Sequence, residues 1–336
     1  PHARSRAWPR DCGGDAADIF TRLSHGRGTL RGMLDTSLAL RALLHRAGAP
    51  IPAMTREARA RMSRPVVAVL GAGDVGSAVA HALHLAGCAT VLIDEADPAW
   101  PRRGMAFTDA WYVGNADLAG VTACFCSSVR SIPVVFERSD KIVATTWSWR
   151  GVAAALDPLA VVDGRVAKRS PPARLKPHEH SALLTVGLGP GYRVGEHVDI
   201  AIETAWGERL GAVVTEGGTQ TFEGEPRPVG GAGRERIVYA PVGGRFNTTR
   251  GIGDRVAAGD PVGSLEGVAI VAPLAGVLRG LSARGARIVP GQKVVEVDPR
   301  GDPALCFGLG ERPRRIAAGV VEALAMRGIL TGVAPA

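Results

Sequence analysis

Three glycines and an aspartate near residue 70 have the types and spacing that nucleotide binding requires. The motif Gly71-x-Gly73-x-x-Gly76 follows an apolar run at 66–70, and Asp94 comes 18 residues after the last glycine. Such glycines allow a tight turn and a close approach of the backbone to phosphate, and the helix N-terminus behind them offers free N–H groups. Asp94 would then hold the ribose diol. The pattern predicts a bound nucleotide; the alternative is a turn kept only for helix–sheet packing.

Asp74 stands inside this turn, where a carboxylate would face the phosphate and repel it. That residue argues against ordinary nicotinamide chemistry. The sequence also shows no Tyr-x-x-x-Lys or Ser/Tyr/Lys set of the kind that such oxidoreductases use. Catalytic residues are therefore not assigned, and no metal ligands are expected.

Two basic stretches are candidates for holding the anionic part of a ligand. Arg102-Arg103 follows the second expected strand, and fork-shaped guanidinium donors suit phosphate. The stretch Asp163-Gly-Arg165-Val-Ala-Lys168-Arg169 follows an expected strand at 160–162, at the edge where open α/β sheets bind ligands. We expect its three cations to face that edge and grip phosphate. The alternatives are a solvated arginine pair and a structural salt-bridge cluster.

A second glycine-rich turn reads Gly187-Leu-Gly189-Pro-Gly191, and its glycines are assigned to the same cofactor-binding set. Asp199 and Glu203 come after it, with alternating polar and apolar residues around 198–202 that indicate a strand. Two carboxylates on one face of a strand could do acid–base or metal work. The alternative is a solvated face of a sheet.

The charge of the chain is unevenly distributed. Residues 1–64 hold 12 arginines and 5 acidic residues, whereas the remaining 272 residues hold 28 basic and 27 acidic groups. Of the net charge of +8, +7 therefore belongs to residues 1–64 and +1 to the rest, and no nucleic-acid-binding face is expected. Apolar runs of about 18 residues, a signal peptide and a regular cysteine framework are not visible, which favours a cytoplasmic protein without a membrane span.

The order of apolar runs predicts an α/β, Rossmann-like nucleotide-binding domain at 65–170. Short strands are expected at 122–125, 133–136, 142–145 and 160–162. From residue 183 the pattern becomes all-β, which gives a β-rich middle region at 171–234. An extension of unclear role at 1–61 and a C-terminal helix and tail at 301–336, with the helix at 314–326, complete the chain.

A repeat with an offset of 32 residues marks the stretch at 235–300. Ala240-Pro241 recurs as Ala272-Pro273, and the matched glycines are 244 and 276, 253 and 285, and 259 and 291. Glycines at matched offsets predict turns with positive φ between short strands. We expect a barrel-sandwich hybrid domain of the biotinyl or lipoyl type. The hairpin at 265–268, Leu-Glu-Gly-Val, lacks the lysine of those carriers, so covalent biotin or lipoate is not expected.

Taken together, these residues resemble the YqeB-type accessory proteins of selenium-dependent molybdenum hydroxylase systems. The shared residues are Gly-Ala-Gly-Asp at 71–74, Arg102-Arg103 with Phe107 and Ala110-Trp-Tyr, Val-Asp-Gly-Arg-Val-Ala-Lys-Arg at 162–169, Val-Gly-Leu-Gly-Pro-Gly-Tyr at 186–192, Ile202-Glu-Thr204, Gly207 with Leu210-Gly211, and the Ala-Pro repeats to Val297-Asp-Pro299. In its first domain that family is similar to xanthine dehydrogenase maturation factors.

The resemblance implies a helper in the maturation of a molybdenum hydroxylase. It would bind a nucleotide-containing cofactor, either a molybdopterin nucleotide or NAD(P), and assist its modification or insertion. Its partners would be the hydroxylase or other maturation proteins, and the oligomeric state stays open, a homo-oligomer included. Two other functions remain: an NAD(P)-dependent oxidoreductase that uses the same turn, and a non-enzymatic docking module.

Overall fold

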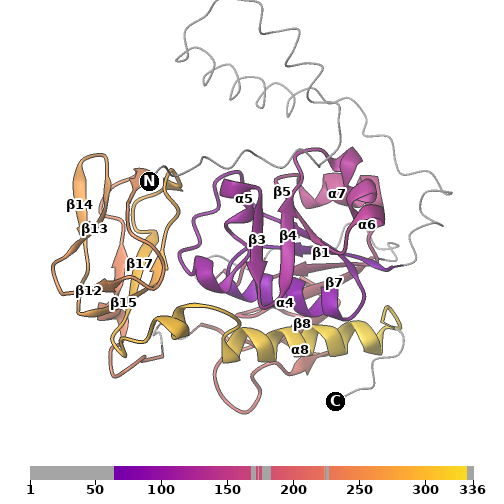
Figure 1. Cartoon of the computed structure of the whole chain (residues 1–336). Coiled ribbons are helices and arrows are strands. Elements are labelled where there is room, and N and C mark those ends of the chain that lie inside the picture. Colours follow the sequence, from indigo (N-terminus) through magenta and orange to yellow (C-terminus); the bar gives the residue numbers. More distant parts are fainter. Residues whose placement is uncertain are drawn as a thin grey trace, which may run out of the picture. The chain divides into compact units, whose positions relative to one another are not determined.

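A computed structural model describes residues 64–167, 172, 174–175, 183–222, 224 and 227–330 (Figure 1). These residues belong to one compact unit, Met54–Ala336. Lys168 and Arg169 lie outside the described residues, so their expected contact with an anion stays a prediction.

One nine-stranded sheet forms the larger part of this unit. Its order is β3-β4-β5-β2-β1-β6-β7-β8-β9. Neighbouring strands from β4 to β8 run parallel, and the edge strands β3 and β9 run antiparallel to their neighbours. The strands are β1 (Val66–Leu70), β2 (Ala89–Ile93), β3 (Asn115–Leu118), β4 (Val121–Phe125), β5 (Ile142–Thr145), β6 (Ala160–Asp163), β7 (Leu184–Leu188), β8 (Ile200–Ile202) and β9 (Val213–Val214).

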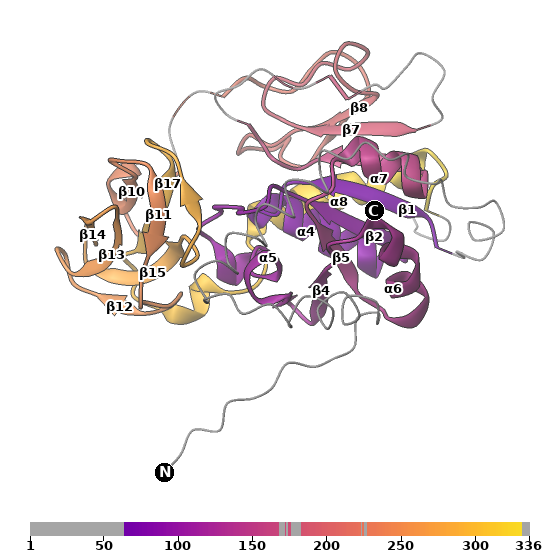
Figure 2. The ribbon, with the colours of Figure 1, turned by 90° about the horizontal axis from the view of Figure 1, so that it is seen from above.

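Helices cover both faces of this sheet. The helix α4 (Asp74–Leu85) connects β1 to β2, a step toward the β3 edge of the sheet. The helix α7 (Trp149–Leu156) connects β5 to β6, a step toward the β9 edge. Because both crossovers between parallel strands are right-handed, the two helices lie on opposite faces. The helix α6 (Ile132–Arg138) is drawn near α7 in Figure 1, whereas Figure 2 shows the two helices apart; both contact the short helix η2. The remaining short helices are η1 (Arg103–Met105), α5 (Ala110–Val113), η2 (Val129–Ser131), η3 (Arg234–Arg236) and η4 (Pro303–Cys306).

The strand expected at 133–136 is wrong, because these residues belong to α6. Its Pro-Val-Val-Phe sequence has the β-branched character of a strand. Pro133, however, stands in the first turn of the helix, where its missing N–H costs nothing.

The C-terminal helix α8 (Glu311–Met326) packs along α4, which confirms the helix expected at 314–326 (Figure 1). Gly319 makes this packing possible. A Cβ at Gly319 would collide with the carbonyl oxygen of Gly211 and lie 3.2 Å from Ile202. The apolar face of α8 therefore joins the same core as β8.

Two four-stranded antiparallel sheets follow, in the orders β10-β17-β15-β12 and β14-β13-β11-β16. Strands β11, β12 and β13 begin 32 residues before β15, β16 and β17, respectively. If each of β11, β12 and β13 is exchanged with its counterpart β15, β16 or β17, and β10 with β14, the strand order of one sheet becomes that of the other. The strands are β10 (Ile237–Tyr239), β11 (Gly244–Asn247), β12 (Arg255–Val256), β13 (Pro261–Leu265), β14 (Val268–Val271), β15 (Gly276–Leu281), β16 (Arg287–Ile288) and β17 (Lys293–Asp298).

The backbone confirms the turns that the repeat predicts. The matched glycines have φ values of 140° and 157° at 244 and 276, 88° and 86° at 253 and 285, and 86° and 76° at 259 and 291. The hairpin at 265–268 is also present: Leu265 pairs with Val268, and Glu266 and Gly267 between them both have positive φ.

The expected fold class is nevertheless wrong. Strands β7, β8 and β9, expected in a separate β-rich middle region, extend the sheet that begins with β1. The result is one large mixed sheet with two antiparallel sheets, and not a Rossmann-like domain followed by a β-rich region and a barrel-sandwich hybrid. The reason is that β7 pairs in parallel with β6, and this pairing buries the edge at which a Rossmann-like sheet was expected to end. The domain limits stay a prediction.

Across the described residues, none of the helices has the length and apolar character that a membrane crossing requires.

Candidate ligand-binding site

The glycine turn lies between β1 and α4, at the edge where the parallel strands end, as expected. The hydroxyl groups of Ser77 and Thr108 both donate to the carbonyl oxygen of Ala72, at 3.0 and 2.8 Å. The Ser77 oxygen also accepts the backbone N–H of Phe107. The turn is therefore held from two sides by buried hydrogen bonds.

Asp94 lies at the end of β2 and faces the turn. Its Oδ2 accepts the backbone N–H of Ala72 at 2.5 Å and the indole N–H of Trp100 at 2.6 Å. Burial raises the pKa of Asp94, and the two hydrogen bonds act in the opposite direction. A ribose that bound Asp94 would have to displace the N–H groups of Ala72 and Trp100 from its carboxylate.

Close contacts with neighbouring atoms explain the glycines of the turn. A Cβ at Gly73 would lie 3.0 Å from the ring of Trp100, and one at Gly71 would lie 2.9 Å from Cγ of Arg165. A Cβ at Gly76 would collide with the carbonyl oxygen of Gly71. Trp100 thus occupies the space in front of Gly73 that a pyrophosphate would need.

Asp163 and Arg165, predicted as site residues, meet at the same edge. Arg165 donates to both carboxylate oxygens of Asp163, at 2.9 and 2.5 Å, and the Tyr192 hydroxyl donates to Oδ2 at 2.8 Å. Burial, followed by the Asp163 charge, raises the pKa of Tyr192. Because Asp163 holds Arg165 in place and Arg165 packs on Gly71, the two predicted loops form one unit.

The second glycine turn completes this edge of the sheet. A Cβ at Gly187 would collide with the ring of Tyr192, and one at Gly189 would lie 3.0 Å from the Thr204 hydroxyl oxygen. The peptide bond between Gly189 and Pro190 is cis, and Gly191 has a φ of 77°. These glycines therefore make room for neighbouring side chains of the protein itself.

Asp74, which the sequence marks as unusual, is half of an ion pair. Its carboxylate accepts Nη1 of Arg102 at 2.8 Å, and Arg102 also donates Nε and Nη2 to the two oxygens of Glu296, both at 2.8 Å. Burial alone would raise the pKa of Asp74, but Arg102 holds it below its usual range. Arg102 thus connects the start of α4 to β17.

Three further cations surround these two carboxylates. Lys293 and Arg236 pair with Glu296, and Arg312 of α8 lies close enough to Asp74 for their charges to interact. We call Asp74, Arg102, Arg236, Lys293, Glu296 and Arg312 the charge cluster. Four of its members are cations and two are carboxylates; Glu203 also acts on the charge of Arg312, and Asp298 acts on that of Arg236.

Two cations of the cluster lie in surroundings that do not fully satisfy them. Burial and the charge of Arg102 lower the pKa of Lys293 to about 8, although Glu296 acts in the opposite direction. Arg236 has a 3% exposed side chain, and within the described part of the chain its Nε has no hydrogen-bond partner. A buried donor without an acceptor is uncommon in folded proteins. An anion beside Lys293 would favour the charged form of this side chain.

Arg103 points elsewhere, although it follows Arg102 directly. It pairs with Asp109 at 2.7 Å and donates Nε to the carbonyl oxygen of Leu281 at 2.8 Å. The two arginines that were predicted to act together therefore have different partners: Arg102 belongs to the charge cluster, and Arg103 bonds to Asp109 and Leu281.

Sequence reasoning did not select Trp100, Tyr192, Arg236, Lys293, Glu296 or Arg312. The sequence does carry a signal for Glu296. Glu296 and Asp298 alternate with valines in β17, and a charged side chain within an apolar strand requires a partner. The partner of Glu296 could not be named, because Arg102 is 194 residues away.

The residues of the glycine turn do not fit a dinucleotide in its usual position. Trp100 lies over Gly73, Asp94 is bonded within the fold, and the carboxylate of Asp74 stands at the N-terminus of α4. A phosphate group fits the charge cluster better, because cations from several elements converge there. The two positions are adjacent, since Asp74 belongs to both.

A relative of the chain is the "Uncharacterized protein YqeB" of Escherichia coli (strain K12), which is 33% identical over 261 residues. The match includes 78% of this chain and 47% of the relative, so the chain spans about half the length of the curated protein it matches. The matched region is of the YqeB type. This agrees with the resemblance carried by the glycine turn and the stretch at 162–169.

No protein-family model matches the chain. Among solved structures, the ectoine utilization protein EutE (DoeB) of Ruegeria pomeroyi is 13% identical, with 70% of this chain and 85% of that chain covered and a TM-score of 0.21. A succinylglutamate desuccinylase/aspartoacylase of Rhodobacter sphaeroides is 12% identical, with coverage of 70% and 86% and a TM-score of 0.20. Similarities this slight carry no argument about activity.

Proposed function

We propose that the chain is an accessory protein in the maturation of a molybdenum hydroxylase, and that it binds the phosphate-bearing part of a nucleotide-containing cofactor at the charge cluster. The observation that carries the proposal is the convergence of Arg102, Lys293 and Arg312 on Asp74. These cations come from the segment after β2, from β17 and from α8. Asp74 and Glu296 compensate part of this positive charge, and an added anion would lower the repulsion among the cations further.

Each cation has a distinct part in this arrangement. Arg102 bridges the two carboxylates, Lys293 pairs with Glu296, and Arg312 donates Nε to the carbonyl oxygen of Thr204 at 2.8 Å; these bonds do not use all the donors of Lys293 and Arg312, to which we assign the ligand. Lys293 is 25% exposed, so a ligand can reach it from solvent. An added phosphate would favour the charged form of Lys293 and raise its pKa above the present value of about 8.

The maturation role rests on the resemblance to YqeB-type accessory proteins, and the match to YqeB supports the family alone. An NAD(P)-dependent oxidoreductase is less well supported. Asp94 and Trp100 already bond to each other at the place where a dinucleotide would lie. The proposal assigns ligand binding to these residues and no chemical step.

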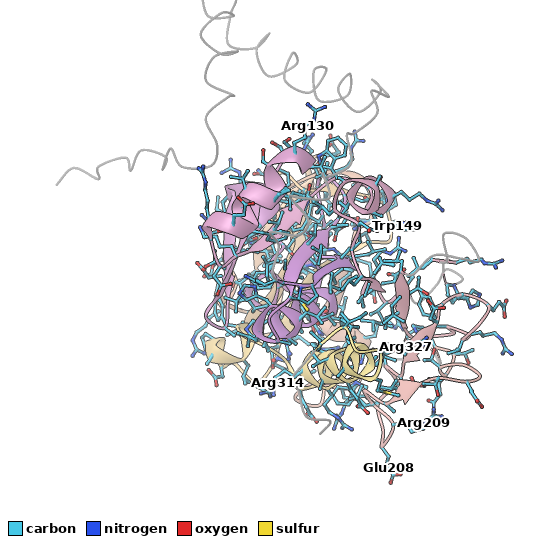
Figure 3. All side chains as sticks on the ribbon, turned by 90° about the vertical axis from the view of Figure 1, so that its right-hand side faces the viewer. Arg130, Trp149, Glu208, Arg209, Arg314 and Arg327 are labelled. Carbon is cyan, nitrogen blue, oxygen red and sulfur yellow. The ribbon has the colours of Figure 1, made fainter. Side chains whose placement is uncertain are left out.

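The proposal is tested in a host that lacks its own copy of the protein. The Lys293→Met/Arg312→Met double variant should leave the partner hydroxylase made but inactive, whereas the wild type restores its activity. Arg314→Met is the matched control. Arg314 is an exposed arginine of α8 that projects from the body, as Figure 3 shows. Full hydroxylase activity with the double variant would exclude this role for the charge cluster.

A further inference from the structure

A hollow lies beside Arg103, which follows Arg102 of the charge cluster directly. It has a volume of about 560 Å³, which is within the range of small-molecule sites. Residues of η1, α5 and the loops after β11 and β15 line it. The lining residues are Arg103, Asp109, Tyr112, Val113, Thr248, Thr249, Arg250, Ala283 and Arg284.

Positive charge predominates in this hollow. Arg103 is neutralised by Asp109 at 2.7 Å. Arg250 and Arg284 come from two different loops, and among residues 64–167 and 183–330 as far as described, neither guanidinium group has a hydrogen-bond or ion-pair partner. Arg250 is half-buried and Arg284 exposed, so both guanidinium groups can be reached from solvent by an anion, whose planar oxygen atoms suit their donors.

The rest of the lining offers apolar surface. The Tyr112 hydroxyl donates to the carbonyl oxygen of Pro98 at 3.0 Å, and its half-buried ring packs against the core of the antiparallel sheets while also lining the hollow. Val113 is 63% exposed, and Ala283 contributes a methyl group. A ring and two aliphatic groups beside two guanidinium groups suit a ligand with a flat apolar body and an anionic end.

We propose that this hollow binds a small phosphorylated aromatic molecule of the nucleoside monophosphate class. Arg250 and Arg284 hold the phosphate, and Tyr112 packs against the ring. The site shares no residue with the charge cluster, and it goes beyond the function proposed above.

Isothermal titration calorimetry of the full chain tests the proposal with four probes: adenosine monophosphate, phenyl phosphate, inorganic phosphate and adenosine. We expect the two phosphorylated aromatic probes to bind, and inorganic phosphate and adenosine to bind at least about tenfold more weakly, since each lacks one half of the interaction. Equal affinity for inorganic phosphate and phenyl phosphate would overturn the aromatic part of the proposal.

The Arg250→Ala/Arg284→Ala double variant should weaken binding of phenyl phosphate at least about tenfold. Arg287→Ala is the matched control, because Arg287 is an exposed arginine of β16 outside the lining. Absence of binding to the wild type, or unchanged affinity in the double variant, would overturn the site. Either result leaves the Lys293 and Arg312 experiment unaffected, so the two proposals fail separately.

Discussion

Arg102 and Glu296 form a two-pronged ion pair across 194 residues of sequence, with both N–O distances at 2.8 Å. Glu296 is fully buried in β17, and Arg102 continues from it to Asp74 at the start of α4. The pair therefore joins the antiparallel sheets to the edge of the nine-stranded sheet. It also fixes the position of the charge cluster.

Replacement of Glu296 by glutamine should lower the free energy of unfolding by about 3–5 kcal/mol, because a buried ion pair that loses one partner leaves an uncompensated charge. Three cations, Arg102, Lys293 and Arg236, would lose their common carboxylate. Chemical denaturation measures the change. Glu322→Gln, on the exposed side of α8, is the control and should stay within about 0.5 kcal/mol of the wild type. A similar loss in both variants would contradict the role of Glu296.

Lys293 should make stability depend on pH in the alkaline range. Its pKa is about 8 in the folded protein and 10.5 in the reference state. Between these values the unfolded chain binds more protons than the folded one, so the free energy of unfolding rises with pH. We expect the wild type to gain stability relative to Lys293→Met between pH 8 and 10.5. A constant difference between the two proteins over this range would show that Lys293 has an ordinary pKa.

Two glycines of the turn should respond differently to alanine. Gly76→Ala places a methyl group on the carbonyl oxygen of Gly71 and should cost about 3 kcal/mol, although helix propensity alone favours alanine. Gly73 has a φ of −70°, and its new methyl group would only touch Trp100, so Gly73→Ala should cost about 1 kcal/mol. Thermal melts compare them. Equal melting temperatures would contradict the close contact between Gly71 and Gly76.

The hydrogen bond from Tyr192 to the carboxylate of Asp163 should contribute more to the free energy of unfolding than the bond from Tyr112 to a neutral carbonyl oxygen. Tyr192→Phe removes a donor from a buried carboxylate and should cost about 1.5–3 kcal/mol. Tyr112→Phe removes a bond to a neutral carbonyl oxygen and should cost about 0.5–1.5 kcal/mol. Urea denaturation of both variants measures the difference. A larger loss in the free energy of unfolding for Tyr112→Phe than for Tyr192→Phe would contradict the prediction.

Local signals in the sequence predict local structure well in this chain. The run at 66–70, the glycine turn and Asp94 form the expected β1–α4–β2 unit, because burial on both faces and helix packing leave a direct pattern. The matched glycines of the repeat have positive φ for a similar reason, since glycine enters that region without steric cost.

Long-range pairing could not be predicted in the same way. The apolar run of β7 has no feature that tells whether it joins the first sheet or begins another, and this choice decides the fold class. Trp100 looks like an ordinary loop residue until its indole N–H is found on Asp94. Asp94, which the sequence predicts to bind a ribose, therefore bonds to Trp100 instead, and the spacing of the residues does not reveal this hydrogen bond.

Mass spectrometry of the small molecules released from the purified protein tests the central claim most directly. We predict that the wild type and Arg314→Met release the same phosphate-bearing nucleotide, and that Lys293→Met/Arg312→Met releases little or none. The loss should occur while the double variant keeps its folded circular dichroism spectrum. No nucleotide from the wild type, or equal amounts from all three proteins, would contradict a ligand at the charge cluster.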